Sequence, residues 1–307
     1  MPRATAPRPA IVCAGHATLD AIVAIPRLPR RDERLPATDG LLAGGGPAAT
    51  AAVALARLGV PVAFAGRVGD DHAGTLVREG LAREGVDVSL LATVSGTTPF
   101  TAVLVGPHGD RVLLPASGSL PAIELSPGLR AALADAAWLH VDHAGAGLLP
   151  FARAAAPGIR LSIDGGNPIA GLSLAGVDLY APTVATLLDL TGTASIDPGM
   201  EAALAAGAGI VVATDGARGA YGAAKDSGDM GVMHVPARPV PGLVSTLGAG
   251  DAFHGGLLAA LLDGRPLETA LAIANAVAGA STRALDGRSA LPDRAALDAM
   301  LAADPVA

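Results

Sequence analysis

The segment Gly248-Ala249-Gly250-Asp251 has the clearest chemistry in the chain. An apolar stretch follows it directly, so we expect the segment to form the N-terminus of a helix. Backbone N–H groups there are unpaired and lie at the positive end of the helix dipole, and glycine lets an oxyanion approach the backbone closely. Gly248, Ala249 and Gly250 are therefore predicted to form an anion hole for phosphate that contains no lysine.

Asp251 begins the same predicted helix. We expect the positive field of the helix to keep its carboxylate ionised, so that it can accept a proton from a hydroxyl that attacks the γ-phosphoryl group of ATP. An aspartate that only caps a helix after a glycine-rich loop is the structural alternative. The segment predicts phosphoryl transfer with Asp251 as the general base.

Other nucleotide motifs are missing from the sequence. A Walker A loop needs Gly-Lys-Ser/Thr, but the one lysine of the chain, Lys225, follows Ala224, and the same fact excludes a protein-kinase lysine motif. No Gly-x-Gly-x-x-Gly fingerprint follows the first predicted strand, so dehydrogenase chemistry is not expected.

The composition narrows the class of protein further. The 307 residues carry a net charge of -7, no basic run and only 2% aromatic residues, which argues against a nucleic-acid partner. No apolar run reaches bilayer length, and no signal-peptide core follows residues 1–9, so we expect a cytoplasmic protein without a membrane partner. Cys13 is the single cysteine, and no Cys/His cluster has zinc-ligand spacing.

Apolar segments of strand length alternate with helical patterns along the chain. This rhythm predicts an α/β fold with a doubly wound, mostly parallel sheet, in one domain over residues 1–307, with ligands beyond the carboxyl ends of the strands. Hairpins are expected at 100–114 and 221–235. The predicted strands are 10–13, 21–25, 62–65, 86–88, 138–141, 160–164, 179–181 and 210–213, and the predicted helices are 47–58, 73–83, 129–136, 149–155, 183–190, 251–263 and 267–284.

Two signatures resemble those of the ribokinase-like, or PfkB, carbohydrate kinases. Residues 245–256 resemble the C-terminal signature of that family, and residues 44–49 together with 66–71 resemble its N-terminal signature. The similarity in order and spacing extends from about Ile11 to Pro292. Within the family, the sequences of residues 44–52 and 251–255 are most similar to those of the 6-deoxy-6-sulfofructose kinases. The resemblance implies a ribokinase-like fold, ATP as phosphoryl donor, Mg²⁺ and a small sugar or sugar derivative as acceptor.

The resemblance also implies residues for the acceptor. Asp20 would bind sugar hydroxyls, although a turn-capping role is the alternative, and the backbone of Gly45 and Gly46 would face the sugar. Thr50 stands where many relatives have asparagine, so one acceptor contact is expected to be shortened or lost. Arg34 would reach an anionic substituent of the sugar, as Arg67 and Arg111 also could, with a solvated surface charge as the alternative for each.

Two further features concern the surroundings of the acceptor. The resemblance implies that residues of about 20–42 and 97–115 form a small β-sheet lid, which excludes water and pairs two subunits, so we expect a homodimer. His140, Asp142 and His143 end a predicted strand on the ligand side. A polar strand-end contact is the preferred interpretation of these three residues, and metal binding is the alternative.

The nucleotide would contact the turn at residues 214–219 through Thr214, Gly216 and Gly219, and Asn275 would border the adenine. Two segments depart from the family pattern. Thr183 and Thr186 replace the Asn-x-x-Glu motif that organises magnesium, so the protein ligands of Mg²⁺ stay unknown. Ser245 and Leu247 replace residues of the monovalent-cation site, so potassium activation is not expected.

These departures keep two alternatives to a sugar kinase open. The first is a sugar- or nucleotide-binding regulator that has the kinase fold without turnover. The second is a nucleoside kinase, which the scarcity of aromatic residues for base stacking disfavours.

Overall fold

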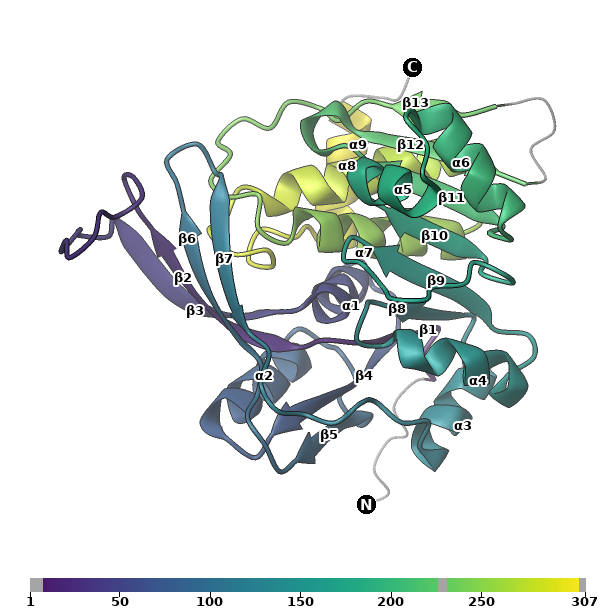
Figure 1. The fold of residues 1–307 in the computed structure, drawn as a ribbon, viewed down its shortest axis with the longest axis horizontal. Coiled ribbons are helices and arrows are strands. Elements are labelled where there is room, and N and C mark those ends of the chain that lie inside the picture. The colour runs from purple at the N-terminus through teal and green to yellow at the C-terminus, as the bar shows by residue number, and fades with distance from the viewer. Residues whose placement is uncertain (1–7, 226–230, 304–307) are drawn as a thin grey trace.

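A computed structural model describes residues 8–225 and 231–303. Residues 1–7 lie outside the described part of the chain. They belong to the N-terminal segment on which the prediction about a signal peptide rests. The large sheet has the strand order β13-β12-β11-β10-β9-β8-β1-β4-β5, and its strands run parallel except β12 and β13 at one edge (Figure 1). The strands are β1 (Ile11–Ala14), β4 (Val62–Gly69), β5 (Leu91–Val94), β8 (Trp138–Val141), β9 (Arg160–Gly165), β10 (Leu179–Pro182), β11 (Ile210–Thr214), β12 (Ala220–Ala224) and β13 (Met233–Val235).

Helices cover both faces of this sheet, which confirms the predicted doubly wound architecture. Both cores consist mainly of Ala, Val, Leu and Ile, and Cys13 is buried in one of them. One face carries α1 (Pro47–Arg57), α2 (His72–Arg83), α7 (Ala249–Leu262), α8 (Leu267–Ser281) and α9 (Arg294–Ala303), and the other carries α3 (Pro127–Asp135), α4 (Leu149–Ala155), α5 (Val184–Thr191) and α6 (Ile196–Ala205). The short turns η1 (Ala146–Leu148) and η2 (Gly216–Arg218) complete the helical segments.

Helix α7 is packed closely between α1 and α8, because two glycines follow its first turn. A Cβ at Gly255 would lie 2.8 Å from the carbonyl oxygen of Ala51 in α1, and one at Gly256 would lie 3.1 Å from Cα of Ala274 in α8. Side chains at either position would push α7 away from its neighbours. This packing fixes the position of the N-terminus of α7, and therefore of the turn at residues 248–251.

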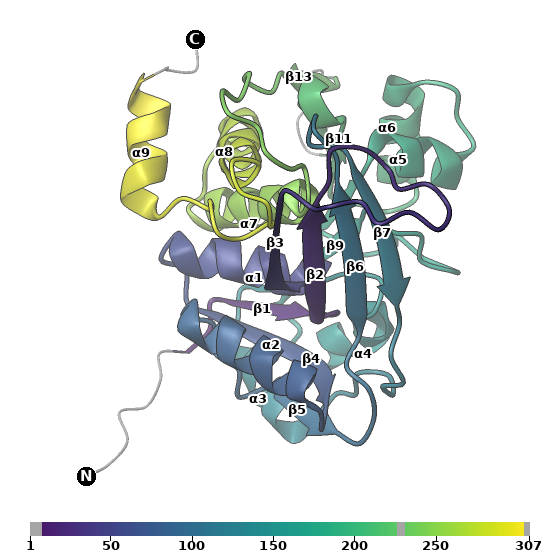
Figure 2. The same cartoon turned by 90° about the vertical axis from the view of Figure 1, so that its left-hand side faces the viewer.

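A small sheet projects from the large one, as the side-on view of Figure 1 and the facing view of Figure 2 show. Its strand order is β3-β2-β6-β7, with β2 and β6 parallel and the other pairs antiparallel. An apolar cluster of Ile22, Val103 and Val105 with Leu247 and Leu285 joins this sheet to the body. The strands are β2 (Thr18–Ala24), β3 (Asp39–Gly45), β6 (Phe100–Val105) and β7 (Arg111–Ala116).

The structure differs from the sequence-based elements at a few places. Residues 39–45 form β3, for which no separate strand was predicted although the expected lid reached residue 42, and α6 and α9 were not predicted. The extended segment expected at 86–88 contributes only an isolated bridge, between Asp87 and Ala63, and the regular strand β5 begins at Leu91. Both predicted hairpins are present, as β6–β7 and β12–β13. Among the residues described, no helix combines the length and the apolarity needed to cross a membrane.

Candidate active site

Two cavities meet at the carboxyl ends of the parallel strands, beside the N-terminus of α7. The first has a volume of about 410 Å³ and is lined by Asp20, Gly45, Gly46, Thr50, Gly248 and Asp251, among others. The second, of about 710 Å³, is lined by Thr214, Gly216, Gly219, Asn275 and Ala249, among others. Gly250 lines both cavities. The predicted phosphate turn therefore forms the boundary between two spaces of ligand size.

The turn has the backbone that its sequence predicts. Gly248 is the N-cap of α7 with φ 72°, in the left-handed region that favours glycine, and no side chain caps the helix there. A Cβ at Gly248 would also lie 2.8 Å from Cα of Gly287, whereas a Cβ at Gly250 would have no atom within 4 Å. The first glycine is required by the chain itself, and the second leaves open space on the cavity side.

Asp251 is half-buried in the first turn of α7 and lines the first cavity. Burial, followed by the negative charge of Asp164, raises the pKa of Asp251 to about 7, although His254 and Arg288 oppose this shift. Burial therefore opposes the ionisation of this carboxyl that we expected from the helix field.

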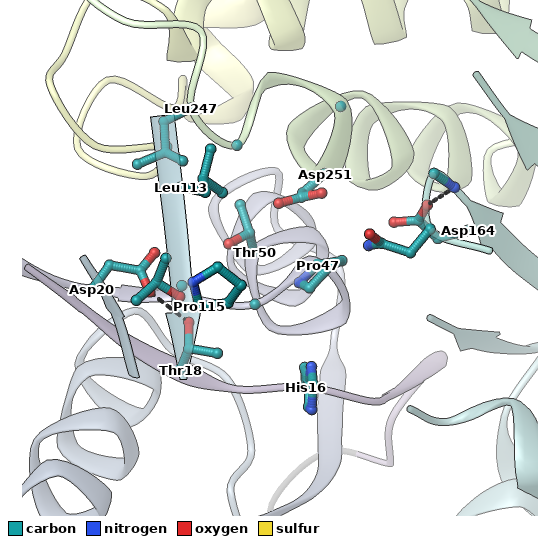
Figure 3. Close-up of a pocket in the computed structure, with 18 of the residues that line it drawn as sticks. His16, Thr18, Asp20, Pro47, Thr50, Leu113, Pro115, Asp164, Leu247 and Asp251 are labelled. Carbon is teal, nitrogen blue, oxygen red and sulfur yellow. Dashed lines mark hydrogen bonds between the residues drawn. The ribbon is translucent and has the colours of Figure 1, made fainter. Parts of the chain in front are cut away.

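Asp20 lies at the opposite end of the first cavity. Figure 3 shows Asp20 and Thr18 on one side, Asp164 on the other and Asp251 between them. The carboxylate of Asp20 accepts a hydrogen bond of 2.7 Å from Thr18 Oγ1. Burial raises the pKa of Asp20, against the hydrogen bond from Thr18 and the charge of Arg288. Gly45 leaves room for this carboxylate, since a Cβ there would collide with it.

Arg288 is a buried cation beside the first cavity that the sequence reading missed. Its Nε donates to Thr50 Oγ1 at 3.1 Å, and its Nη2 donates to the carbonyl oxygen of Gly45 at 2.7 Å. Burial lowers the pKa of Arg288 to about 10, although Asp20 and Asp251 favour its charged form. Thr50 therefore holds a cation at the place where the family resemblance suggested a shortened sugar contact.

The residues expected to contact the nucleotide lie together around the second cavity. Gly216 and Gly219 have φ 56° and 100°, so the turn after β11 depends on both glycines. Thr214 Oγ1 lies 3.5 Å from the carbonyl oxygen of Pro182, which links the ends of β11 and β10. Asn275 Nδ2 donates to the carbonyl oxygen of Val235 at 3.0 Å and so anchors the end of β13 beside the cavity.

The three arginines that could reach an anionic sugar substituent have different positions. Arg34 is exposed in the loop between β2 and β3 and is not among the residues that line either cavity. Arg67 is paired with Glu124 at 3.7 Å. Arg111 lines both cavities, and its Nη1 donates to Thr246 Oγ1 at 2.7 Å, next to the phosphate turn.

The polar residues predicted at the end of β8 are His140, Asp142 and His143, and they make different contacts. Asp142 accepts hydrogen bonds from the backbone N–H groups of His16 at 2.8 Å and Ala48 at 3.2 Å, and therefore ties the end of β1 to the start of α1. This is the polar strand-end contact that we preferred. His143 packs edge-on against His16, while His140 faces away from both, toward His254.

His254 and Asp164 form a buried pair beside His140. Burial alone would lower the pKa of His254. The negative charge of Asp164, the hydrogen bond of the ring to that carboxylate and the charge of Asp251 together raise this pKa above its ordinary value. Burial would raise the pKa of Asp164, but His254 holds it well below its usual range. His140 has a pKa lowered to about 3 by burial and then by His254, so its ring is neutral.

The segments that depart from the family pattern have local structural roles. Thr183 is the N-cap of α5 and accepts from the backbone N–H of Thr186 at 3.1 Å. Ser245 Oγ accepts from the backbone N–H of Leu247 at 3.1 Å, and the Leu247 side chain packs in the apolar cluster that joins the small sheet to the body. Neither segment brings a carboxylate to the cavities.

A fold of this kind, with its paired cavities, is that of a nucleotide-dependent sugar kinase, and the comparisons with known proteins agree. Residues 8–154 and 169–294 match the pfkB family carbohydrate kinase description, so the chain belongs to this family. It is 30% identical to the ATP-dependent ribose-1-phosphate kinase of Halopiger xanaduensis, over 95% of this chain and 97% of the relative. It is 33% identical to the acarbose 7(IV)-phosphotransferase of an Actinoplanes strain, over 94% and 96%. The chain is an ATP-dependent carbohydrate kinase.

The solved structures support the fold. The ribokinase of Arabidopsis thaliana, complexed with ribose and ATP, superimposes with a TM-score of 0.80 at 24% identity, covering 96% of this chain and 99% of the other. The ribokinase of Giardia lamblia gives a TM-score of 0.83 at 20% identity, covering 95% and 100%. The predicted ribokinase-like fold is thereby confirmed.

Proposed function

We propose that this kinase transfers the γ-phosphoryl group of ATP to a hydroxyl of a small sugar or sugar derivative held in the first cavity. The proposal assigns Asp251 as the general base and the turn Gly248–Gly250 as the anion hole. The observation that carries it is the position of this turn, since Gly250 lines both cavities and Asp251 lines the first. ATP would occupy the second cavity, against Thr214, Gly216, Gly219 and Asn275.

In the proposed reaction, unprotonated Asp251 accepts the proton of the attacking hydroxyl. The sugar oxygen then forms a bond to the γ-phosphorus, the bond from that phosphorus to the bridging oxygen breaks, and ADP leaves. The backbone N–H groups at the start of α7 face the negative charge of the transferred group. Asp20, at the other end of the cavity, would accept hydrogen bonds from sugar hydroxyls and orient the acceptor.

Magnesium would supply positive charge to the phosphates of ATP. The loop in which the resemblance places the magnesium motif does not fit a protein-held ion, because the hydroxyls of Thr183 and Thr186 lie 2.9 Å apart, bonded to each other, and supply no carboxylate. We therefore propose that Mg²⁺ arrives as the ATP complex, held by phosphate oxygens. Potassium activation is not expected, since Leu247 packs its side chain in an apolar cluster.

The nature of the acceptor is narrowed by the charges around the first cavity. Arg288 is buried behind Gly44 and Gly45, and Arg111 lines both cavities. Arg111, which lines the cavity, favours an acceptor with an electronegative or anionic substituent. Arg34 stays a predicted contact for such a substituent, and it would need the loop that carries it to move over the cavity.

Replacing the base tests the reaction directly. Asp251→Asn should lower kcat by about 10²–10⁴-fold with little change in ATP affinity, because the amide cannot accept the proton. The matched control is Asp263→Asn, at the exposed end of the same helix, which should keep turnover unchanged. Near-normal turnover by Asp251→Asn would remove the base assignment.

A substrate screen separates the alternatives. ATP consumption should be measured with ribose, fructose, 2-keto-3-deoxygluconate, 6-deoxy-6-sulfofructose and adenosine. Turnover with a sugar supports the proposal, and preference for adenosine would favour a nucleoside kinase. Tight binding of a sugar or of ATP without turnover would favour the regulator. The 6-deoxy-6-sulfofructose subgroup and the cytoplasmic location stay predictions from the sequence.

A further inference from the structure

A buried cluster of His140, Asp164 and His254 lies at the wall of the first cavity, and none of the three transfers a proton or a phosphoryl group in the reaction proposed above. The residues come from β8, from β9 and from α7, and all three are buried. Each supplies an atom that can bind a metal, and these atoms lie within 4.8 Å of one another. Elements far apart in sequence thus bring two imidazoles and one carboxylate to one point.

One ring nitrogen that could bind the ion, Nε2 of His140, lacks a hydrogen-bond partner within the described part of the chain. A buried polar atom without a partner is uncommon, because it loses its hydration and gains nothing in return. The other nitrogen of His140, Nδ1, lies 2.9 Å from Ser162 Oγ. Such an outer hydrogen bond orients a histidine ring in metal sites and leaves the second nitrogen for the ion.

The spacing of the pair also fits a shared ion. Asp164 Oδ1 and His254 Nε2 lie 3.3 Å apart. Charge-assisted hydrogen bonds are shorter, at about 2.7–2.9 Å. Two ligands of a tetrahedral zinc ion, each bound at about 2.0–2.1 Å, are separated by roughly 3.3 Å. The spacing of this pair therefore also fits two ligands of one metal.

We propose that His140, Asp164 and His254 form a binding site for a divalent transition metal ion of the zinc class. Two imidazole nitrogens favour such an ion over Mg²⁺ or Ca²⁺, which prefer oxygen ligands. Asp164 and His254 line the first cavity, so the fourth coordination position opens to the cavity and can take water or a ligand oxygen. This ion is separate from the Mg²⁺ that accompanies ATP.

The test uses Co²⁺ as a visible probe on the full chain, prepared without a histidine tag and stripped with a chelator. Titration should give one Co²⁺ per chain with the intense visible absorption of a four-coordinate site, and Zn²⁺ should displace it. His254→Gln and Asp164→Asn should each weaken Co²⁺ binding at least tenfold. The matched control, His72→Gln, changes an exposed histidine at the start of α2 and should bind Co²⁺ as the unmodified chain does.

His140 lies in the core, so its outer contact is changed instead. Ser162→Ala should weaken Co²⁺ binding less than His254→Gln does, and thermal melting without metal shows whether each variant is folded. Added Co²⁺ should raise the melting temperature of the unmodified chain and leave that of His254→Gln nearly unchanged. Absence of one-to-one binding, or unchanged affinity in folded His254→Gln, would overturn the site. These measurements need neither ATP nor sugar, so their outcome is independent of the proposed reaction.

Discussion

At the scale of single residues, burial and the neighbouring charges together set the pKa of Asp251. Burial and Asp164 favour its protonated form, while His254 and Arg288 favour the carboxylate. Burial and Asp164 have the larger effect, and the resulting pKa is about 7. This value suits a general base, because a base works best when its pKa is close to the operating pH. A fully solvated aspartate would be a weaker acceptor for the proton of a sugar hydroxyl.

The pH dependence of turnover follows from this value. Because only unprotonated Asp251 accepts a proton, kcat/KM should rise as pH increases through about 7 and then level off. A rate that is flat across the range from about pH 5 to pH 8 would contradict the assignment. The terminal phosphate of ATP ionises in a similar pH range. The titration of Asp251 therefore needs a second measurement that uses no nucleotide.

Protein stability provides that readout. The folded-state pKa of Asp251 is raised from the ordinary 3.8 to about 7, so the folded protein holds a proton that the unfolded chain loses. Stability due to this group is present below about pH 4 and is lost as pH rises through about 7. Asp251→Asn should therefore melt at a higher temperature than the unmodified chain at pH 8, with a difference that shrinks in acid. An equal difference at every pH would show that Asp251 does not titrate in this range.

Sequence reasoning found the site residues that form local patterns and missed those brought in from a distance. Gly248 to Asp251 form a contiguous segment whose backbone chemistry can be read directly. Arg288, by contrast, is a lone arginine whose partners, Thr50 and Gly45, are more than two hundred positions away. His254 lies three residues after Asp251, and that helical spacing was the available signal that it shares the same face.

At the scale of elements, the two glycines at the start of α7 serve different purposes. Gly248 has φ 72° and lies against Gly287, while Gly250 faces open space between the cavities. The first is needed for the backbone, and the second leaves room for a ligand.

Paired alanine substitutions separate these reasons. Gly248→Ala should lower the free energy of unfolding by about 2 kcal/mol or more, through the left-handed backbone and the contact with Gly287. Gly250→Ala should keep or slightly raise stability, since alanine is the better helix former by about 1 kcal/mol, yet raise the KM for ATP. Urea unfolding and steady-state kinetics measure both effects. Equal losses of stability would show that the two glycines serve the same purpose.

The small sheet is connected to this turn. The backbone N–H of Thr246 donates to the carbonyl oxygen of Gly109 at 3.1 Å, and Arg111 binds the Thr246 hydroxyl. Leu247 packs with Ile22 and Val103 of the small sheet. The departure from the family pattern at Leu247 thus has a packing reason that the sequence could not show, because its partners come from other segments.

Elements that depend on tertiary partners were the ones that sequence reasoning missed. Strand β3 contains three glycines, which have low strand propensity, and it forms because β2 pairs with its whole length. Helix α6 contains Pro198 and Gly199, which indicate a turn in isolation, although proline is tolerated in the first turn of a helix. Strongly periodic segments such as α1 and α8 were predicted nearly to their ends.

At the scale of the whole molecule, the two sheets have different relations to solvent. Helices cover the large sheet on both faces, but the small sheet has one row, Leu42, Ala21, Ala102 and Leu114, that faces away from the cavity. Leu42 and Leu114 are 62% and 56% exposed. The homodimer stays a prediction from the sequence, and these exposed leucines mark the face at which we expect a second copy to pair.

Light scattering after size-exclusion chromatography tests the homodimer. The unmodified chain should have twice the mass of one chain, and Leu114→Asp should shift it to a single chain, because a buried carboxylate opposes the pairing. Phe151→Asp is the matched control, since Phe151 is 58% exposed on α4, outside the small sheet, and its variant should stay paired. A monomeric unmodified chain would exclude the homodimer.

Cys13 has a practical consequence for testing whether the small sheet moves. It is the one cysteine of the chain, it is completely buried in β1, and burial followed by the charge of Asp142 raises its pKa, so its thiol is unreactive at neutral pH. A cysteine introduced at exposed His108, in the turn between β6 and β7, would therefore be the single labelled position in the native protein. A fluorescent dye attached there would report whether the small sheet moves when sugar or ATP is added.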